Sequence, residues 1–138
     1  MIKRLYTVKW VLKGYQKPEG GGRENNPDWH FILEKLDKLR HDDGTVTLKL
    51  ILKNSEGKEL SVYAKNDHYS IIFNDIDADG DILRTSYNRE AKKGLHEMHG
   101  LDWDARTIFT DYDAVYDIFK QFFETGEVSS SPILPGGP

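Results

Sequence analysis

Residues 110–126 read Thr-Asp-Tyr-Asp-Ala-Val-Tyr-Asp-Ile-Phe-Lys-Gln-Phe-Phe-Glu-Thr-Gly, and this stretch decides the fold. At about 100° per residue its apolar side chains share one stripe, which predicts a helix laid against a core. The stripe consists of Tyr112, Val115, Ile118, Phe119 and Phe122. Thr110 is expected to cap the first turn, and Gly126 to end the helix in a left-handed conformation. A helix this aromatic needs a broad apolar surface to pack on.

Segments in which polar and apolar residues alternate can supply that surface, because alternation predicts strands with one buried face. Turn residues separate these segments at 54–57, 66–67 and 75–81, and such short connections force neighbouring strands to be antiparallel. The strands are expected at residues 2–13, 46–52, 60–65, 69–73 and 83–87, with a candidate sixth strand at 95–101. An antiparallel sheet of five to six strands, with two helices packed on one face, is an α+β fold.

The other helix is expected to begin at Asn26-Pro27-Asp28, where Asn26 would cap it and Pro27 would take its first position. Its apolar stripe consists of Trp29, Ile32, Leu33, Leu36 and Leu39. Phe31 falls roughly 130° from the centre of that stripe and should not reach the same core. Residues 14–25 are rich in glycine and are expected to form a loop. Two interpretations of Phe31 stay open: the loop covers it, or it is exposed for a partner.

Length and composition predict a single domain at residues 1–134 and a short tail at residues 135–138. The chain has 138 residues, of which 38% are hydrophobic, and this is enough for one core. It contains no cysteine, which excludes disulfides and suits a reducing compartment. Its basic opening lacks the apolar block of a signal peptide, and no apolar run approaches the roughly 20 residues of a membrane span. We therefore expect a cytoplasmic protein without membrane contact.

Charge divides unevenly between the two halves of the chain. Residues 1–69 carry 13 Lys+Arg and 10 Asp+Glu, a net charge of +3, whereas residues 70–138 carry 6 and 13, a net charge of −7. This balance argues against nucleic acid as a partner, because nucleic-acid binding needs a basic surface. It indicates instead that the second half could meet a basic protein.

Residues 75–82 match the front of a calcium-binding loop, with aspartates at positions 1, 3 and 5, glycine at position 6 and an aliphatic residue at position 8. The twelfth position, where a bidentate glutamate should close the site, is Ser86. A hairpin turn uses aspartate and glycine for the same backbone reasons. The pattern therefore favours a solvated turn, and a weak calcium site is the alternative.

Histidines form the next candidate site. His96 and His99 are three residues apart, so on a helix both rings would share a face and could hold a metal together with His68 or Glu97. The segment between the flanking glycines is too short for a helix, however, and on a strand the two rings would point to opposite faces. We therefore expect these histidines to be structural.

The other side chains that could carry chemistry form no recognisable catalytic arrangement. His30 and His41 lie beside no nucleophile or paired carboxylates, and Ser129-Ser130-Ser131 fall in a segment expected to be flexible. The sequence therefore predicts no catalytic residue, no metal and no cofactor. A small enzyme or metal-binding module that uses the turn at residues 75–81 remains the alternative.

The segment Gly100-Leu-Asp-Trp-Asp-Ala-Arg106 and the helix that ends in Phe122-Phe123-Glu-Thr-Gly126 follow a meander. This arrangement resembles bacterial immunity proteins of the first class in polymorphic and contact-dependent toxin systems, and also a related uncharacterised bacterial family. In the immunity family a short strand with a tryptophan follows the Phe-Phe-x-x-Gly ending, and residues 128–134 contain no tryptophan. The resemblance implies a cytoplasmic protein without catalysis that binds a cognate toxin, such as a nuclease, and blocks it.

A toxin that acts on nucleic acid could be blocked by carboxylates placed where the phosphates would bind. Acidic groups would steer a basic partner, and aromatic side chains would anchor it. We therefore expect the partner to dock on the acidic turn and on one shoulder of the last helix. The alternative is that these charges only keep the fold soluble. The expected docking residues are Asp75, Asp77, Asp79, Trp103, Asp104, Asp113, Tyr116 and Asp117.

Overall fold

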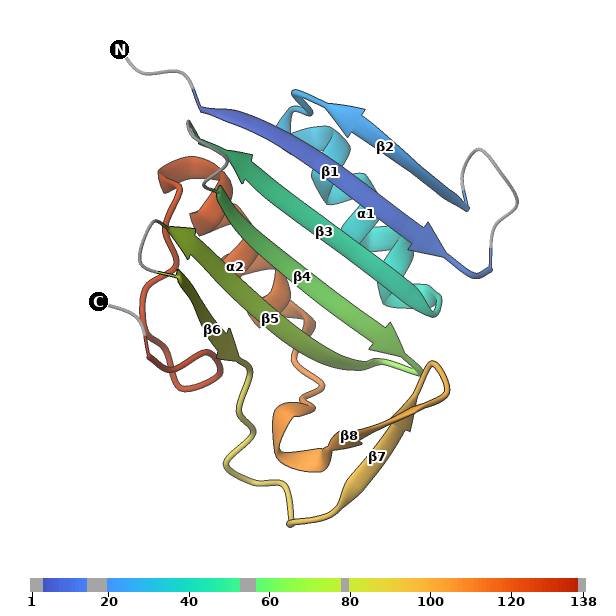
Figure 1. Ribbon diagram of the computed structural model, residues 1–138. Coiled ribbons are helices and arrows are strands. Elements are labelled where there is room, and N and C mark those ends of the chain that lie inside the picture. The colour runs from blue at the N-terminus through green and yellow to red at the C-terminus, as the bar shows by residue number, and fades with distance from the viewer. Residues whose placement is uncertain (1–3, 15–19, 53–56, 78–79, 137–138) are drawn as a thin grey trace.

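A computed structural model describes residues 4–14, 20–52, 57–77 and 80–136 of the chain. They form a six-stranded antiparallel sheet with two α-helices on one face and a separate two-stranded hairpin (Figure 1), which confirms the expected α+β class. No helix in the described part of the chain is long and apolar enough to cross a membrane. The elements are β1 (Leu5–Leu12), β2 (Gly21–Asn25), α1 (Trp29–His41), β3 (Gly44–Ile51), β4 (Gly57–Lys65), β5 (His68–Asp77), β6 (Gly80–Thr85), β7 (Leu95–Met98), β8 (Leu101–Asp104), the 3-10 helix η1 (Ala105–Thr107) and α2 (Tyr112–Thr125).

The strand order of the sheet is β2-β1-β3-β4-β5-β6. From β3 to β6, strands adjacent in the sequence are adjacent in the sheet, as the short turns predicted. β1 joins this meander through α1 and pairs with β3 from Leu5, opposite Ile51, to Leu12, opposite Gly44. A side chain at Gly44 would meet the carbonyl oxygen of Val11 at 1.9 Å. Only glycine therefore fits where α1 passes into β3.

The core lies between the sheet and the two helices, because alternate residues of each strand face the helices. On the sheet side it consists of Tyr6, Val8, Trp10, Leu12, Val46, Leu48, Leu50, Leu60, Val62, Ala64, Tyr69, Ile71 and Phe73. On the helix side it consists of Ile32, Leu36 and Leu39 of α1 and Val115, Ile118, Phe119 and Phe122 of α2. Both expected stripes are thus confirmed as core-facing, although Trp29, Leu33 and Tyr112 are only partly buried.

Both helices begin one or two residues later than the sequence suggested. The carboxylate of Asp111, and not Thr110, caps α2 by accepting a hydrogen bond from the Asp113 backbone N–H at 3.0 Å. The carboxylate of Asp28 caps α1 by accepting from the Phe31 backbone N–H at 2.8 Å, so the proline before it lies outside the helix. A carboxylate accepts more strongly than a neutral group at the positive end of a helix, which explains the choice of cap. Gly126 ends α2 with φ 77°, as expected.

A strand occupies part of the segment where a loop was expected. β2 pairs with β1 and places Gly22 opposite Trp10. A side chain on Gly22 would come within 2.8 Å of the Trp10 indole, so the glycine gives room for the ring against the edge strand. The prediction of a loop was wrong for residues 21–25, because glycine here accommodates a cross-strand neighbour.

Phe31 packs against the same tryptophan, with ring centres 5.4 Å apart in an edge-on arrangement. The expectation that it would not reach the core was wrong, since it is partly buried against the core residues. Lys35 is only 5% exposed, and its ammonium lies 4.5 Å from the Trp10 ring centre and 4.8 Å from that of Phe31. This cation–π packing gives Phe31 a structural role.

The candidate sixth strand belongs to the separate hairpin. β7 and β8 pair through a two-residue turn in which His99 has φ 56° and Gly100 has φ 78°, the conformation of a tight hairpin turn. The expectation of one strand at residues 95–101 followed by a connection was therefore wrong, because this turn was not recognised. The hairpin lies at one end of the sheet (Figure 1), and Trp103 of β8 contacts Tyr63 of β4 with ring centres 5.0 Å apart.

Arg84 of β6 fastens the C-terminal segment to the sheet. Arg84 is opposite the core residue Phe73 in the register. The residue before it, Leu83, is 59% exposed on the helix-free face. Leu83, which begins the strand expected at residues 83–87, therefore does not face the core as the alternation there had suggested. The Arg84 guanidinium donates hydrogen bonds to the carbonyl oxygens of Val128 (2.7 Å), Ser129 (3.3 Å), Leu134 (2.9 Å) and Pro135 (3.1 Å). Burial lowers the pKa of Arg84, although an arginine stays charged.

The phenol of Tyr6 links β1 to α2, and it makes stability depend on pH. Its hydroxyl donates to the carbonyl oxygen of Phe122 at 2.7 Å, and burial raises the pKa of Tyr6 to about 12. Burial also raises the pKa of Tyr69 and of Tyr112. In the unfolded chain these phenols ionise near a pKa of about 10. The unfolded state therefore releases protons first, and stability should fall as pH rises from about 10 towards 12.

Urea unfolding at pH 9 and pH 11 measures this effect. Tyr6→Phe should cost about 1 kcal/mol at neutral pH, the usual worth of one hydrogen bond, and should make the alkaline loss smaller. An equally steep alkaline loss in Tyr6→Phe and in the original protein would show that Tyr6 does not contribute to it.

Candidate functional site

The acidic turn expected at residues 75–81 is part of a β-hairpin. Asp75 pairs with Ile82 and Asp77 with Gly80 across β5 and β6, and Asp79 lies outside the described residues. Asp75 Oδ2 lies 3.8 Å from the Lys58 ammonium, which also pairs with Glu127. A calcium loop instead wraps six or more oxygen ligands around the ion. In the described part of the chain, no group of three or more His, Asp or Glu side chains is arranged to hold a metal ion.

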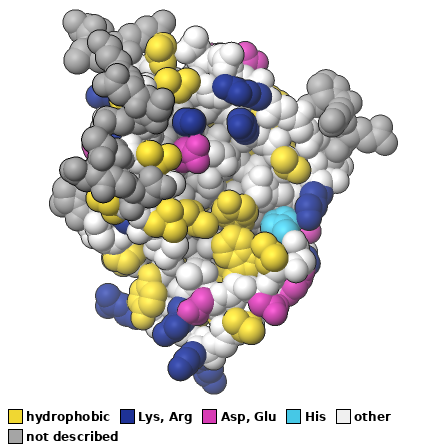
Figure 2. Space-filling model, viewed as in Figure 1, with side chains coloured by type: hydrophobic (Ala, Val, Ile, Leu, Met, Phe, Trp, Pro, Cys, Tyr) yellow, Lys and Arg dark blue, Asp and Glu magenta, His cyan; other side chains and the backbone are white. Residues whose placement is uncertain are grey.

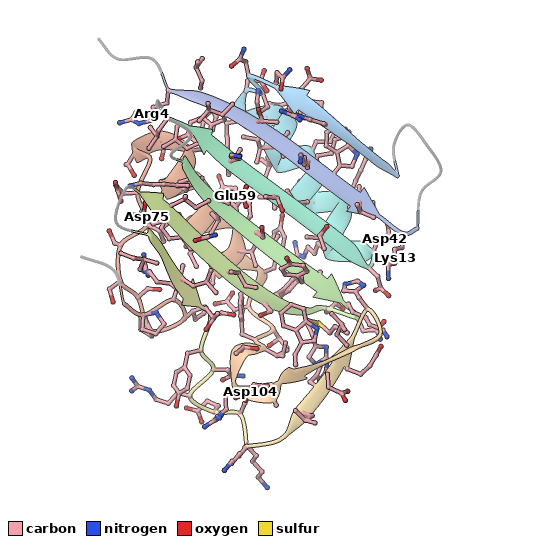
Figure 3. The ribbon with its side chains drawn as sticks, viewed as in Figure 1. Arg4, Lys13, Asp42, Glu59, Asp75 and Asp104 are labelled. Carbon is pink, nitrogen blue, oxygen red and sulfur yellow. The ribbon has the colours of Figure 1, made fainter. Side chains whose placement is uncertain are left out.

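Trp103 and Asp104 lie on the hairpin at another end of the molecule. Figure 3 shows Asp104 well apart from Asp75. The Trp103 indole N–H donates to the Met98 carbonyl oxygen at 3.2 Å, so this ring packs within its own hairpin and on Tyr63. Asp104 receives hydrogen bonds from the side chain and the backbone of Arg106, and these lower the pKa of Asp104 to about 2. Both docking candidates therefore already have partners within the fold.

The three candidates on α2 have different surroundings. Tyr116 packs edge-on against Trp29 of α1, with ring centres 5.6 Å apart. Asp117 is exposed and lies beside a cavity of about 300 Å³ lined also by residues 129–131. Asp113 is exposed in the first turn and lines a different cavity. The expected docking residues that the structure describes thus do not form one surface, because they occupy β5, the β7–β8 hairpin and two sides of α2.

Asp113 belongs to a groove that the sequence analysis did not identify. A cavity of about 440 Å³ lies between the end of α1, the β4–β5 turn and the start of α2. A second cavity of about 220 Å³ shares Arg40 and Asp67 with it and extends towards the junction of α1 and β3. We call the two together the acidic cleft. Its lining residues are Arg40, Asp42, Asp43, Asn66, Asp67, Tyr69, Thr110, Asp111, Tyr112 and Asp113.

Tyr112 forms the wall of the acidic cleft. Its hydroxyl donates to Asp37 Oδ1 at 2.7 Å, and the guanidinium of Arg40 lies 4.7 Å from its ring centre. Burial and the bond to Asp37 raise the pKa of Tyr112, so this phenol remains neutral. The ring is thus held in place by one charged group at its tip and another over its face. It offers a fixed aromatic surface beside the carboxylates.

The carboxylates of the acidic cleft differ in how far the fold uses them. Asp111 caps α2, and Asp43 Oδ1 accepts from the Asn66 backbone N–H at 3.2 Å. For Asp67 and Asp113, the described residues supply no hydrogen bond or ion pair to the carboxylate. Asp67 has φ 61°, a conformation that asparagine and aspartate tolerate best. Two carboxylates on opposite walls are therefore available for a cation from solution.

The fold brings these residues together through the topology of the meander. β3 begins directly after α1, and its first residue pairs with Ala64 near the end of β4, so the end of α1 and the β4–β5 turn share one end of the sheet. A bridge between Tyr69 and Phe109 then places the start of α2 at the same end. The sequence signals were the acidic pair Asp42-Asp43 and the segment Asn66-Asp67, the second of which had been interpreted only as a turn.

The comparisons with known proteins concern the fold and the family. The chain resembles the crystal structure of a hypothetical protein from Neisseria gonorrhoeae, with a TM-score of 0.62 and 15% sequence identity, over 88% of this chain and 87% of that one. At this identity the likeness shows a shared fold alone. No curated protein matches the chain. A family model described as "Family of unknown function (DUF6911)" matches residues 9–131, so the chain belongs to that family.

Proposed function

We propose that this protein binds a basic protein partner in the acidic cleft, and that the partner is a toxin domain which it neutralises without catalysis. The acidic cleft is the observation that supports binding of a basic partner. The choice of a toxin as the partner rests on sequence: residues 100–106 and the Phe-Phe-x-x-Gly ending of α2 resemble those of immunity proteins. The expected docking residue that supports this location is Asp113, which lines the cleft.

The charge of the acidic cleft supports a basic partner. Its lining contains five aspartates and one arginine, so its net charge is −5 + 1 = −4. The carboxylates lie around two cavities that share Arg40 and Asp67 in their linings, and charges within roughly 10 Å of one another act together at physiological salt. Such a field raises the association rate of a basic surface and repels acidic ones.

The shape and chemistry of the acidic cleft suit a lysine or arginine side chain of the partner. Tyr69 and Tyr112 supply apolar ring surface for the methylene stem, and Asp67 and Asp113 supply carboxylates for the charged end. Arg40 shows that a guanidinium fits against Tyr112, since it lies 4.7 Å from that ring. A partner arginine inserted beside it would meet the carboxylates of both walls.

Removal of two carboxylates tests the binding surface. Asp67→Asn with Asp113→Asn removes two negative charges while asparagine retains the turn at residue 67 and the helix start at residue 113. The control is Asp117→Asn. Asp117 lies one turn further along α2 and lines the separate cavity beside residues 129–131. With a toxin domain encoded beside the gene, the double variant should associate about threefold to tenfold more slowly and with a weaker salt dependence. Asp117→Asn should behave as the original protein.

Two outcomes separate the parts of the proposal. An unchanged association rate and salt dependence in the double variant would exclude the acidic cleft as the interface. If co-expression of this protein does not restore growth of cells that make the toxin domain, neutralisation is excluded, even where the two proteins bind through the cleft.

A further inference from the structure

Two histidines from distant parts of the sequence meet where the β7–β8 hairpin lies on the sheet. His68 is the first residue of β5, and His96 is the second residue of β7. Their ring centres are 4.8 Å apart and their ring planes are tilted by 32°. Both residues are partly exposed, and histidine atoms reach the surface of the helix-free face in Figure 2. An ion in solution therefore has access to the pair.

The hydrogen bond of His68 leaves one of its nitrogens able to bind a metal. Its Nδ1 lies 2.8 Å from the carbonyl oxygen of Asn66. A carbonyl oxygen only accepts, so Nδ1 carries the proton and Nε2 keeps its lone pair. Metal-binding histidines are usually oriented in this way, by a bond from the second ring nitrogen to a carbonyl group. For His96, the described residues supply no hydrogen bond to either ring nitrogen.

The separation of the two rings fits a shared ion. A metal–nitrogen bond of about 2.0–2.1 Å places the ion roughly 3.2 Å from the centre of each imidazole. At a tetrahedral angle, two imidazoles on one ion then have centres about 5 Å apart. The 4.8 Å between His68 and His96 agrees with this value. Water would complete the coordination.

Two hydrogen bonds to β4 hold the part of the hairpin that follows His96. His99 Nε2 donates to the Ala64 carbonyl oxygen at 3.0 Å, and the Lys65 ammonium donates to Glu97 Oε2 at 2.7 Å. This pair raises the pKa of Lys65 and lowers the pKa of Glu97. His99 therefore has the structural role expected from the sequence, while His68 and His96 remain as a preformed pair.

We propose that His68 and His96 form a binding site for a divalent transition metal ion such as Ni²⁺ or Zn²⁺. Imidazole is a preferred ligand of both ions. A bound ion would connect β5 to β7 and so fasten the hairpin to the sheet. The site is separate from the acidic cleft, and its existence does not depend on the proposed toxin partner.

NMR of the untagged protein with NiCl₂ tests the site, because paramagnetic Ni²⁺ broadens nearby signals. Trp103 is opposite His96 in the register, whereas Trp10 faces the helices from β1 and Trp29 belongs to α1. The indole signal of Trp103, assigned with Trp103→Phe, should broaden first. The other two tryptophans provide internal references.

Variants identify the ligands. His96→Phe retains a ring to pack on His68 but cannot bind a metal, and it should weaken Ni²⁺ binding at least tenfold by calorimetry. His68→Gln should do the same, and His30→Gln, which is exposed on α1, should change nothing. Equal Ni²⁺ affinity in His96→Phe and in the original protein would overturn the proposal. So would equal broadening of all three indole signals, or no broadening at all.

Discussion

Replacing Phe122 with alanine is expected to lower the free energy of unfolding by about 3–5 kcal/mol, a large part of the stability of a domain of this size. Phe122 is fully buried, and its ring contacts Tyr6 and Phe73 at centre distances of 5.6 and 5.5 Å. It therefore joins the first and fifth strands to α2. Alanine would leave a cavity at this junction, and rigid strands on one side limit how far it can collapse.

Phe123→Ala provides the matched comparison, since it removes the same atoms from the next residue of the helix. Phe123 is only partly buried, although it contacts Tyr6 at 5.2 Å and Trp29 at 5.9 Å. Its replacement should cost less than half as much in urea or thermal unfolding. Equal losses for the two variants would mean that the shoulder of α2 contributes as much as the central stripe.

Replacing Arg84 with methionine is expected to cost about 2–4 kcal/mol, because four carbonyl oxygens lose a charged donor. Methionine keeps an apolar stem against Phe73, so the loss would come mainly from the hydrogen bonds. Val128 and Leu134, whose carbonyl oxygens accept two of these bonds, are buried residues. The free energy of unfolding in urea measures the loss.

Arg84→Lys separates charge from shape. Lysine keeps the positive charge but lacks the planar fork that reaches several acceptors, so most of the loss should remain. Amide hydrogen exchange at residues 128–135 should rise in both variants, and exchange in β3 and β4 should rise less. Full stability in Arg84→Lys would show that the charge alone holds the segment.

The sequence predicted the parts of the fold that follow a regular period. Tyr6, Val8 and Trp10 alternate strictly, and the stripe of α2 repeats every three to four residues. In both cases one face packs on the core and the other faces away from it, so the spacing of the apolar residues alone reveals the element. Two of the wrong expectations about strands arise where this apolar period is interrupted. In β2 the glycines accommodate a neighbouring ring, and in β6 an arginine occupies the inward position.

Much less of the candidate site could be predicted. Asp113 was identified because it belongs to an acidic helix start, whereas Asp67 had been assigned only to a turn and Arg40 had been assigned no role. These residues are close together because α1, the β4–β5 turn and the start of α2 meet at one end of the sheet. The strand order and register are needed to predict that meeting. The contact between His68 and His96 was missed for the same reason, since it arises only when the hairpin packs beside the start of β5.

Because α2 follows the meander in the sequence, the sheet emerges from the ribosome before the helix that covers it. The meander is complete once Thr85 has emerged, whereas the helix that covers its inner face ends at Thr125. Translation proceeds at roughly 5–20 residues per second, so the apolar side chains of β4 and β5 remain uncovered for seconds. During that interval the nascent sheet exposes the surface that chaperones bind and that promotes aggregation. The folding yield in cells should therefore depend on how quickly residues 86–125 are translated, as much as on the stability of the finished domain.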